Sequence, residues 1–301
     1  MERPTPQGDE MLVRVHAATV NRSDCAVLLA QPFFMRAITG LRRPMRDDLG
    51  SDFAGEVEAV GPHVTRFAVG DKVWGFKDTG LGSQAECLVI RETAVERMPD
   101  GVSFEDAAAS IEGAFYGYNF INKVDVDARS RVLVNGATGA IGSALLQLCK
   151  NASATVTAVG NTKNLDLLRS LGADAVIDYE TTDFTQCGQI FDFIFDAVGK
   201  STFGKCRPLL APHGVYISSE LGPGWQNPFL ALVTPLLGGR RVGFPFPQDV
   251  HGFLGLMKGW LEAGQFRPVI DRRYTLDDIR EAYAYVASGQ KTGNVVLRPN
   301  G

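Results

Sequence analysis

The chain has 301 residues, of which 45% are hydrophobic and 21% charged, a composition typical of an ordinary globular protein and not of a disordered or fibrous one. The formal net charge is −4, and Lys and Arg are concentrated only in residues 40–46, so nucleic-acid binding has little electrostatic support. The five cysteines are odd in number and far apart, which excludes a disulfide framework or a zinc knuckle and favours a reducing cytoplasm.

The sequence does not predict a membrane protein. Its first residues, MERPTPQGDE, are polar and do not form a signal peptide. The longest apolar run, residues 228–239, contains two prolines and is too short to span a bilayer. We expect this run to be a core or interface segment.

The N-terminal part of the chain predicts short β-strands. Residues 11–20, MLVRVHAATV, alternate in hydrophobicity as a strand does. Further short strands, punctuated by glycine-containing turns, are expected within residues 50–76, as in a small barrel-like domain. Farther along, Ser103 is a candidate N-cap of a helix that has Asp106 at its third position.

From residue 131 onward, strands and helices alternate, and helical stretches are expected between the first four strands. The strand candidates are residues 131–135, 154–159, 175–179, 191–198 and 214–219. Their nearly continuous apolar character predicts a parallel sheet that is covered on both faces. Two helical patterns and a last strand follow, at residues 250–264, 276–289 and 294–299.

A glycine-rich turn joins the first of these strands to the helix after it. Residues 132–150, VLVNGATGAIGSALLQLCK, contain Gly136, Gly139 and Gly142 at the spacing of a dinucleotide-binding turn. The first glycine allows the sharp turn, the second lets the backbone approach a pyrophosphate, and the third lets helix and strand pack closely. Free N–H groups at the start of the helix would then face the phosphates.

Several segments together resemble the medium-chain dehydrogenase/reductase superfamily, and within it the zinc-free quinone oxidoreductase (zeta-crystallin-like) group. The matching segments are VNRSD (20–24), GSDFAGEVEAVG (50–61), VGDKVWGF (69–76), NGATGAIGSALLQLCK (135–150), LGADAVIDY (171–179), DAVG (196–199) and TGNVVL (292–297).

The resemblance implies an α/β fold of two domains. One is a Rossmann domain with a doubly wound parallel sheet, residues 114–247. The other is a β-rich GroES-like catalytic domain formed by both chain ends, residues 1–113 and 248–301. Members of this family usually begin with a further strand pair, so we expect either a truncated chain or a native domain that lacks an edge hairpin.

The cofactor expected from these residues is NADPH. The second strand of the parallel sheet ends in residues 160–163, GNTK, without the acidic residue that binds the ribose of NAD. Lys163 would attract a 2′-phosphate, although it could also be a solvated residue, and the resemblance adds Tyr179. The predicted cofactor contacts are Gly136, Thr138, Gly139, Ala140, Ile141, Gly142, Asn161, Thr162, Lys163, Tyr179, Val198, Gly199, Ser218 and Asn294.

No metal is expected. In zinc-containing members of the superfamily, the positions that match Asn21, Ser51 and Glu112 hold the catalytic zinc. Only one of these three residues is a credible zinc ligand, whereas a catalytic site needs three from the protein. The four histidines follow or flank turns or lie on a polar strand face, where a surface role is expected.

Without a metal, hydride transfer from NADPH to an electron-poor acceptor is the favoured chemistry. The acceptor would be a quinone or an α,β-unsaturated carbonyl in a cleft between the two domains. Asn21 and Ser51 are candidate hydrogen-bond donors to the oxygen that becomes negative. Glu112 is a candidate proton donor, or equally a structural cap or ion-pair partner.

The substrate, oligomeric state and alternatives follow from other residues. Aromatic side chains suit a small, planar, apolar substrate: Phe33, Phe34, Tyr116, Tyr118, Phe244 and Phe246.

A homodimer is expected, since residues 240–244 resemble a strand that pairs across a two-fold axis in relatives. An enoyl-thioester reductase is the alternative enzyme, with a basic path at Arg42, Arg43 and Arg46. A NADPH-binding structural or sensor protein is the non-enzymatic alternative.

Overall fold

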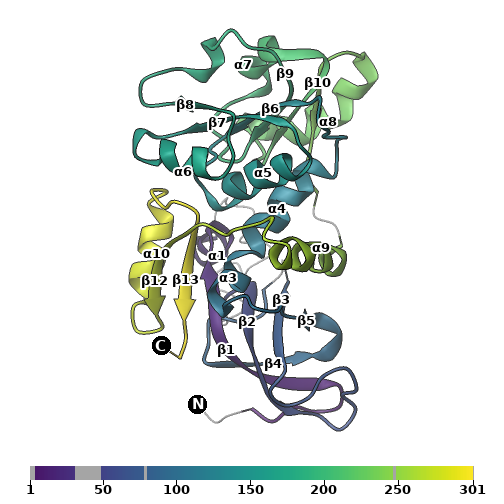
Figure 1. Ribbon diagram of the computed structural model, residues 1–301, viewed down its shortest axis with the longest axis vertical. Coiled ribbons are helices and arrows are strands. Elements are labelled where there is room, and N and C mark those ends of the chain that lie inside the picture. The colour runs from purple at the N-terminus through teal and green to yellow at the C-terminus, as the bar shows by residue number, and fades with distance from the viewer. Residues whose placement is uncertain (1–3, 31–48, 78–79, 247–248, 301) are drawn as a thin grey trace. The chain divides into compact units, whose positions relative to one another are not determined.

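The computed structural model describes residues 4–30, 49–77, 80–246 and 249–300, and the chain divides into two compact units (Figure 1). Unit 1 comprises Met1–Glu112 and Asp249–Gly301, and unit 2 is the continuous segment Gly113–Gln248. Helix α4 (Glu112–Ile121) begins with the last residue of the first segment of unit 1. No helix among the described residues is both long and apolar enough to cross a membrane.

Unit 1 is built around a largely antiparallel sheet with strand order β12-β13-β1-β2-β3-β5, in which β4 also pairs with β1. The strands are β1 (Glu10–Val20), β2 (Asp52–Val60), β3 (Lys72–Phe76), β4 (Cys87–Arg91), β5 (Glu96–Arg97), β12 (Ile270–Thr275) and β13 (Asn294–Arg298). The described helices of this unit are α1 (Arg22–Leu29), α3 (Phe104–Ala109), α9 (Val250–Glu262) and α10 (Ile279–Ala287).

The strand predicted at residues 11–20 is confirmed as β1, but its side chains do not alternate simply between core and solvent. Met11, Leu12 and Val13 are all buried. The pairing of β1 with β2 shifts register between Leu12 and Val13, and again between Val15 and Ala17. Such bulges turn the strand and change which face a side chain occupies, so both faces of β1 contribute to the core.

The predicted helix after Ser103 is confirmed as α3. The Ser103 hydroxyl accepts a hydrogen bond from the backbone N–H of Asp106, which satisfies a free donor of the first turn. Glu105 accepts a hydrogen bond of 2.5 Å from Arg273 Nε and also pairs with Arg298. This carboxylate therefore ties α3 to β12 and β13, elements far away in the sequence.

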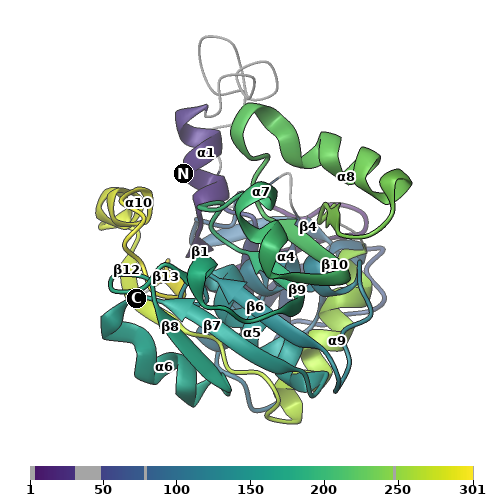
Figure 2. The same ribbon diagram turned by 90° about the horizontal axis from the view of Figure 1, so that it is seen from above.

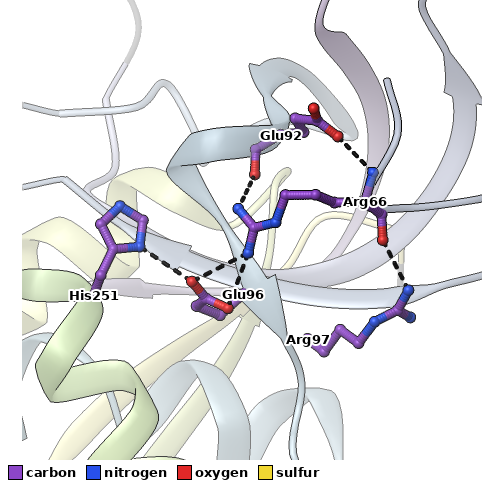
Figure 3. Close-up of polar contacts among 5 residues, drawn as sticks. All are labelled: Arg66, Glu92, Glu96, Arg97 and His251. Atoms are coloured by element: carbon purple, nitrogen blue, oxygen red, sulfur yellow. Dashed lines mark hydrogen bonds and ion pairs between the residues drawn. The ribbon is translucent and has the colours of Figure 1, made fainter. Parts of the chain in front are cut away.

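A second polar cluster ties the start of α9 to β5, and Figure 3 shows Glu96 between His251 and Arg66. The Glu96 carboxylate lies 3.3 Å from Nδ1 of His251 and 3.4 Å from Nη2 of Arg66. Nη1 of Arg66 donates to the carbonyl of Glu92 at 3.1 Å, and Arg97 donates to the carbonyl of Arg66 at 2.9 Å. These contacts attach the returning chain to the β-rich part of unit 1.

Unit 2 contains a six-stranded parallel sheet with order β11-β10-β9-β6-β7-β8. Its strands are β6 (Arg131–Asn135), β7 (Thr155–Gly160), β8 (Ala175–Asp178), β9 (Phe191–Asp196), β10 (Leu210–Ser218) and β11 (Arg241–Gly243). Besides α4, its helices are α5 (Ala140–Asn151), α6 (Leu165–Ser170), α7 (Phe203–Cys206) and α8 (Gln226–Leu237). As Figure 1 shows, α5 and α6 cover one face of this sheet and α7 the other, as predicted for a sheet buried on both faces.

The expectation of a helix between the strands at 175–179 and 191–198 is wrong. The structure has only a single 3₁₀ turn there, Phe184–Gln186, between β8 and β9. The intervening residues contain adjacent threonines and Gly188, and no apolar repeat of helical period that could pack on the sheet. Strand β10 also begins earlier than expected, at Leu210.

The apolar run at residues 228–239 lies mostly in α8, on the outside of unit 2 (Figure 2). Its exposed side chains form one stripe, and none of its helical residues is charged. Leu232 is 75% and Leu236 85% exposed. The opposite side of the helix is anchored to β11 by Thr234, whose hydroxyl accepts from the backbone N–H of Val242 at 2.9 Å.

Candidate active site and cofactor site

The glycine turn after β6 has the geometry that its sequence predicts. Gly136 has a φ of +76°, and a Cβ at this position would lie 2.3 Å from Cγ1 of Val198. A Cβ at Gly142 would lie 2.1 Å from the carbonyl oxygen of Gly136. At Gly139, which has an ordinary φ of −79°, the nearest atom to a Cβ would be 3.7 Å away. Gly136 and Gly142 thus allow close packing of the turn itself, and Gly139 leaves open space beside the backbone.

This turn lies where the strand order of the sheet reverses. Strands β6 and β9 are neighbours, and the chain continues in opposite directions from them. The carboxyl ends of the strands at such a point are where open α/β sheets bind ligands. Gly136 follows β6, and Val198 and Gly199 follow β9, so the structure brings these predicted cofactor residues to the same edge of the sheet.

The loop after β9 is held by one buried carboxylate. Asp196 accepts hydrogen bonds from Nδ2 of Asn135 at 3.0 Å and from the hydroxyl of Tyr216 at 3.1 Å. It also accepts from the backbone N–H groups of Val198, at 3.3 Å, and Ser201, at 2.9 Å. Asp196 therefore fixes the loop against the ends of β6 and β10.

Two carboxylates lie at the end of β7, where the sequence alone indicates none. The hydroxyl of Thr162 donates to Asp178 at 2.5 Å, and its backbone N–H donates to Glu180 at 3.1 Å. Both acids come from the end of β8, which pairs with β7. Lys163 and Tyr179 are exposed beside them. The segment after β7 therefore has one basic side chain, Lys163, close to two acidic ones, Asp178 and Glu180.

The remaining predicted cofactor residues lie at different places. Thr138, Ala140 and Ile141 belong to the glycine turn and the first turn of α5. Asn161 follows β7 and accepts from Nδ2 of Asn164 at 2.7 Å, and Ser218 is buried at the end of β10.

Asn294 is the exception, because it lies in unit 1. Both its backbone N–H and its side-chain Nδ2 donate to the carbonyl of Val269, at 2.7 Å and 3.1 Å.

The turn, the strand reversal and the residues after β7 to β10 fit a dinucleotide.

A buried group of polar side chains in unit 1 surrounds Glu112. Its Oε2 accepts from Nδ2 of Asn21 at 2.9 Å and from the hydroxyl of Ser51, and its Oε1 accepts from the hydroxyl of Ser23. Glu112, Asn21 and Ser51 are each at most 5% exposed, whereas Ser23 is partly exposed. The structure therefore brings together the three residues predicted for catalysis and adds Ser23, which sequence reasoning missed.

The N–H groups of Asn21 all donate within this group of residues. It precedes α1, and its backbone N–H donates to Asp24 at 2.8 Å. Its Nδ2 donates both to Thr19 Oγ1, at 2.6 Å, and to Glu112. Both amide hydrogens are thus donated inside the protein, so Asn21 orients Glu112 in this structure and has no hydrogen left for a substrate oxygen.

The same group contains two further buried carboxyl groups, those of Asp52 and Asp24. Asp52, which is fully buried, accepts from the backbone N–H of Thr19 at 2.8 Å and from its hydroxyl at 2.5 Å. Asp24 is 5% exposed and accepts the backbone N–H of Asn21. Three acidic side chains thus share one buried region, linked through Thr19 and Asn21.

Burial raises the pKa of all three carboxyl groups. It raises the pKa of Asp24 to about 7 and that of Asp52 to about 6. Burial, followed by the negative charges of Asp24 and Asp52, raises the pKa of Glu112 well above its usual range. The pKa of the Lys291 ammonium is lowered to about 8, chiefly by burial, and the charge of Glu112 opposes this shift. Burial and the neighbouring carboxylates therefore favour the protonated form of Glu112.

These residues do not fit a zinc ion. An amide, a hydroxyl and one carboxyl group occupy the positions of Asn21, Ser51 and Glu112, and all three are engaged with one another. Within the described ranges, no group of three or more His, Cys, Asp or Glu side chains is arranged to hold a metal. We therefore derive no step through zinc.

The aromatic and basic residues expected around a substrate are only partly described. Phe33, Phe34, Arg42, Arg43 and Arg46 lie outside the described residues. Phe244 and Phe246 contact each other after β11, with ring centroids 4.8 Å apart. Tyr116 and Tyr118 lie on α4, where the ring of Tyr116 packs against Phe115 at 5.9 Å.

Comparison with known proteins agrees with this geometry. Residues 7–125 match the family model of the alcohol dehydrogenase GroES-like domain, and residues 171–297 match that of the zinc-binding dehydrogenases. The chain is 30% identical over 311 residues to a 2-methylene-furan-3-one reductase of Solanum lycopersicum, covering 98% of this chain and 73% of that protein. The chain belongs to the medium-chain dehydrogenase/reductase superfamily, in its quinone oxidoreductase group.

Two further relatives support the same group and fold. A quinone oxidoreductase of Pseudomonas aeruginosa is 30% identical over 273 residues, with 83% of this chain and 82% of that protein covered. The solved structure of the quinone oxidoreductase from Coxiella burnetii has a TM-score of 0.84 at 23% identity and covers 99% and 93% of the two chains. The fold of this superfamily member is thus a GroES-like domain with a Rossmann-like parallel sheet, and the protein is an oxidoreductase that uses a nicotinamide cofactor.

Proposed function

We propose that this superfamily member is an NADPH-dependent, metal-independent reductase of quinones or α,β-unsaturated carbonyls. The observation that carries the proposal is the place of Glu112, a buried carboxyl group surrounded by hydroxyl and amide partners, in a setting that favours its protonated form. Reduction of either acceptor class needs one hydride and one proton. A nicotinamide cofactor held by the residues of the glycine turn would supply the hydride, and Glu112 would supply the proton.

The contacts of Glu112 indicate the route of this proton. When Glu112 is neutral, its O–H donates to one of the two serine hydroxyls. Ser23 is the more accessible of the two, so we assign it the acceptor role. The Ser23 hydroxyl can then donate its own hydrogen outward, to the oxygen of the acceptor that becomes negative. Asn21 and Ser51 keep Glu112 in place from the other side.

The choice of acceptor class rests on the absence of a fitting Lewis-acid site in this donor set. A simple alcohol needs its hydroxyl pKa lowered before hydride can leave, and an amide and two hydroxyls cannot do so. A quinone or enone is already electron-poor and needs only a hydrogen-bond donor and a proton. A small, planar, apolar substrate suits the aromatic pair Phe244 and Phe246.

We further propose that the protein works in a reducing compartment and without zinc. All five cysteines are free, which supports a reducing compartment such as the cytoplasm. Elemental analysis of active protein should find no stoichiometric zinc.

The experiment that tests the function is a panel of quinones, enones and enoyl thioesters, followed at the absorbance of NADPH. Stoichiometric NADPH oxidation with a quinone or enone is the expected result. Preference for enoyl thioesters would instead establish the related enoyl-thioester reductase. If every acceptor fails while NADPH binds, the protein is a NADPH-binding structural or sensor protein.

We expect Lys163→Ala to weaken NADPH binding selectively. Loss of a charge-assisted contact to the 2′-phosphate costs about 1.5–3 kcal/mol, which is roughly a 10- to 150-fold rise in the NADPH dissociation constant. Glu180→Gln is the matched opposite change, since it removes a negative charge from the same turn and should tighten NADPH binding. Titration of each variant with NADPH and NADH measures both effects. Equal losses for the two cofactors in Lys163→Ala would contradict the assignment.

We also propose a homodimer that forms through α8 and β11. Strand β11 is the last strand of its sheet and pairs only with β10 among the described residues, so its other edge can pair with a second copy. The exposed leucines of α8 would be covered at the same time. Light scattering at micromolar concentration should give the mass of a dimer, and Leu232→Glu with Leu236→Glu should give a monomer. A monomeric wild-type protein would refute the interface.

A further inference from the structure

A chain of hydrogen bonds runs from α10 to the residues around Glu112, entirely within unit 1. The hydroxyl of Tyr283 donates to Oε1 of Gln84 at 2.7 Å. Nε2 of Gln84 donates to the carbonyl of Thr19 at 3.0 Å and to Oδ2 of Asp24 at 3.3 Å. The same Oδ2 accepts the backbone N–H of Asn21 at 2.8 Å, and Asn21 in turn donates to Glu112.

The partners of Gln84 determine how its side-chain amide is oriented. Gln84 faces two oxygen acceptors, the carbonyl of Thr19 and the carboxyl group of Asp24, so its amide nitrogen must point toward them. Its oxygen then faces the opposite way, where the hydroxyl of Tyr283 satisfies it. Removal of that hydroxyl leaves the amide oxygen without this donor and lets the amide rotate away from Asp24.

These contacts involve elements that the sequence separates widely. Tyr283 lies on α10, and Gln84 precedes β4. Tyr283 is 9% exposed, so its hydroxyl is held in a largely dry environment, where a satisfied network fixes one arrangement. Their hydrogen bonds lead to Glu112 through Thr19, Asp24 and Asn21.

We propose that Gln84 and Tyr283 are positioning residues of the reaction site, which fix Asp24 and Asn21 and thereby the orientation of Glu112. The inference rests on the proposed function for its kinetic consequence, whereas the contacts stand independently of it. Through this chain, α10 of the C-terminal segment determines how the proton donor at the start of α4 is held.

The decisive variants are Tyr283→Phe and Gln84→Met, each of which removes one hydrogen-bonding group at nearly constant volume. Tyr285→Phe is the matched control, because Tyr285 lies on the same helix and its hydroxyl donates to Asp271 at 2.7 Å, outside the chain described above. Thermal unfolding of all three variants shows whether they fold like the wild type.

Both Tyr283→Phe and Gln84→Met should lower kcat for the best acceptor of the panel about 3- to 10-fold, the effect of one lost hydrogen bond. The acceptor KM and the NADPH dissociation constant should be unchanged, and Tyr285→Phe should have the kinetics of the wild type. Because the two residues act through one route, the double variant should be little slower than Gln84→Met alone. Multiplicative losses in the double variant, or an equal loss in Tyr285→Phe, would overturn the proposal.

A second readout does not depend on activity. Gln84 favours the charged form of Asp24, so the carboxyl carbon of Asp24, followed by ¹³C NMR, should titrate at higher pH in Gln84→Met than in the wild type. The charged and titratable groups around Asp24 are the same in both proteins: Asp52, Glu112, Arg22, Cys25, Lys291 and Tyr283. An unchanged titration would overturn the positioning role. If the wild type reduces no acceptor, the proposed function fails, and this titration still decides whether Gln84 acts on Asp24.

Discussion

Glu112→Gln should lower turnover with the best acceptor by about 10²- to 10⁴-fold, the usual contribution of a general acid, while NADPH affinity stays unchanged. The replacement preserves the local contacts. Its oxygen can accept from Asn21 and Ser51, and its amide nitrogen can donate to Ser23, as the neutral carboxyl group does. Only the transferable proton is lost. Steady-state kinetics and a cofactor titration measure the two quantities.

The pH dependence gives an independent check of the same residue. Because the pKa of Glu112 is raised in the folded protein, the acid form predominates below that pKa, and wild-type kcat should fall as the pH rises through it. The folded protein also keeps a proton that the unfolded chain loses at lower pH, so stability should fall with rising pH, and less so in Glu112→Gln. Glu281→Gln, an exposed change on α10, is the control. Near-normal turnover in Glu112→Gln would leave this residue only a structural role.

The second large effect is expected from two alanine substitutions in the glycine turn. Gly142→Ala places a Cβ 2.1 Å from the Gly136 carbonyl and 2.7 Å from Cα of Ala137, so backbone must move. Such overpacking costs about 1–3 kcal/mol of folding free energy or more. Gly139→Ala meets nothing closer than 3.7 Å and has a permitted φ, so its stability should equal that of the wild type.

The two variants therefore separate packing from binding. In Gly139→Ala the new methyl group occupies the space where the backbone would approach a pyrophosphate, so cofactor affinity should fall roughly tenfold or more. Denaturant unfolding and a cofactor titration on both proteins provide the comparison. Unchanged NADPH affinity in Gly139→Ala would show that the cofactor phosphates do not lie beside this glycine.

The convergence of Asn21, Ser51 and Glu112 could be predicted from sequence because the resemblance implies that they occupy the three positions that hold zinc in zinc-containing members. The use of both amide hydrogens of Asn21 could not, since it depends on where Thr19 and Glu112 meet in space. Gln84 and Tyr283 stand in segments with no chemical signature, and their contact joins positions far apart in the chain. Residue type alone does not reveal such a pair.

The sheet of unit 2 was predictable for a different reason. Strands β6 to β10 contain short apolar runs, and buried parallel strands need that composition, so local sequence was sufficient for them. Strand β11, which has the sequence Arg-Val-Gly, was expected only from the resemblance. The two acids beside Thr162 do not follow from the sequence of β7, the strand that ends just before Thr162. Asp178 and Glu180 reach the turn from the neighbouring strand, and strand adjacency is a property of topology.

The pairing of β1 with β13 has a consequence for how the protein forms during synthesis. Val20 lies opposite Val295, and Ala18 opposite Leu297, in a sheet whose central strand is β1. Strand β1 is therefore synthesised long before its partner β13, whereas all strands of unit 2 emerge as one continuous segment. Unit 2 should acquire its fold first on the nascent chain, and β1 should rely on chaperones until β13 has been synthesised.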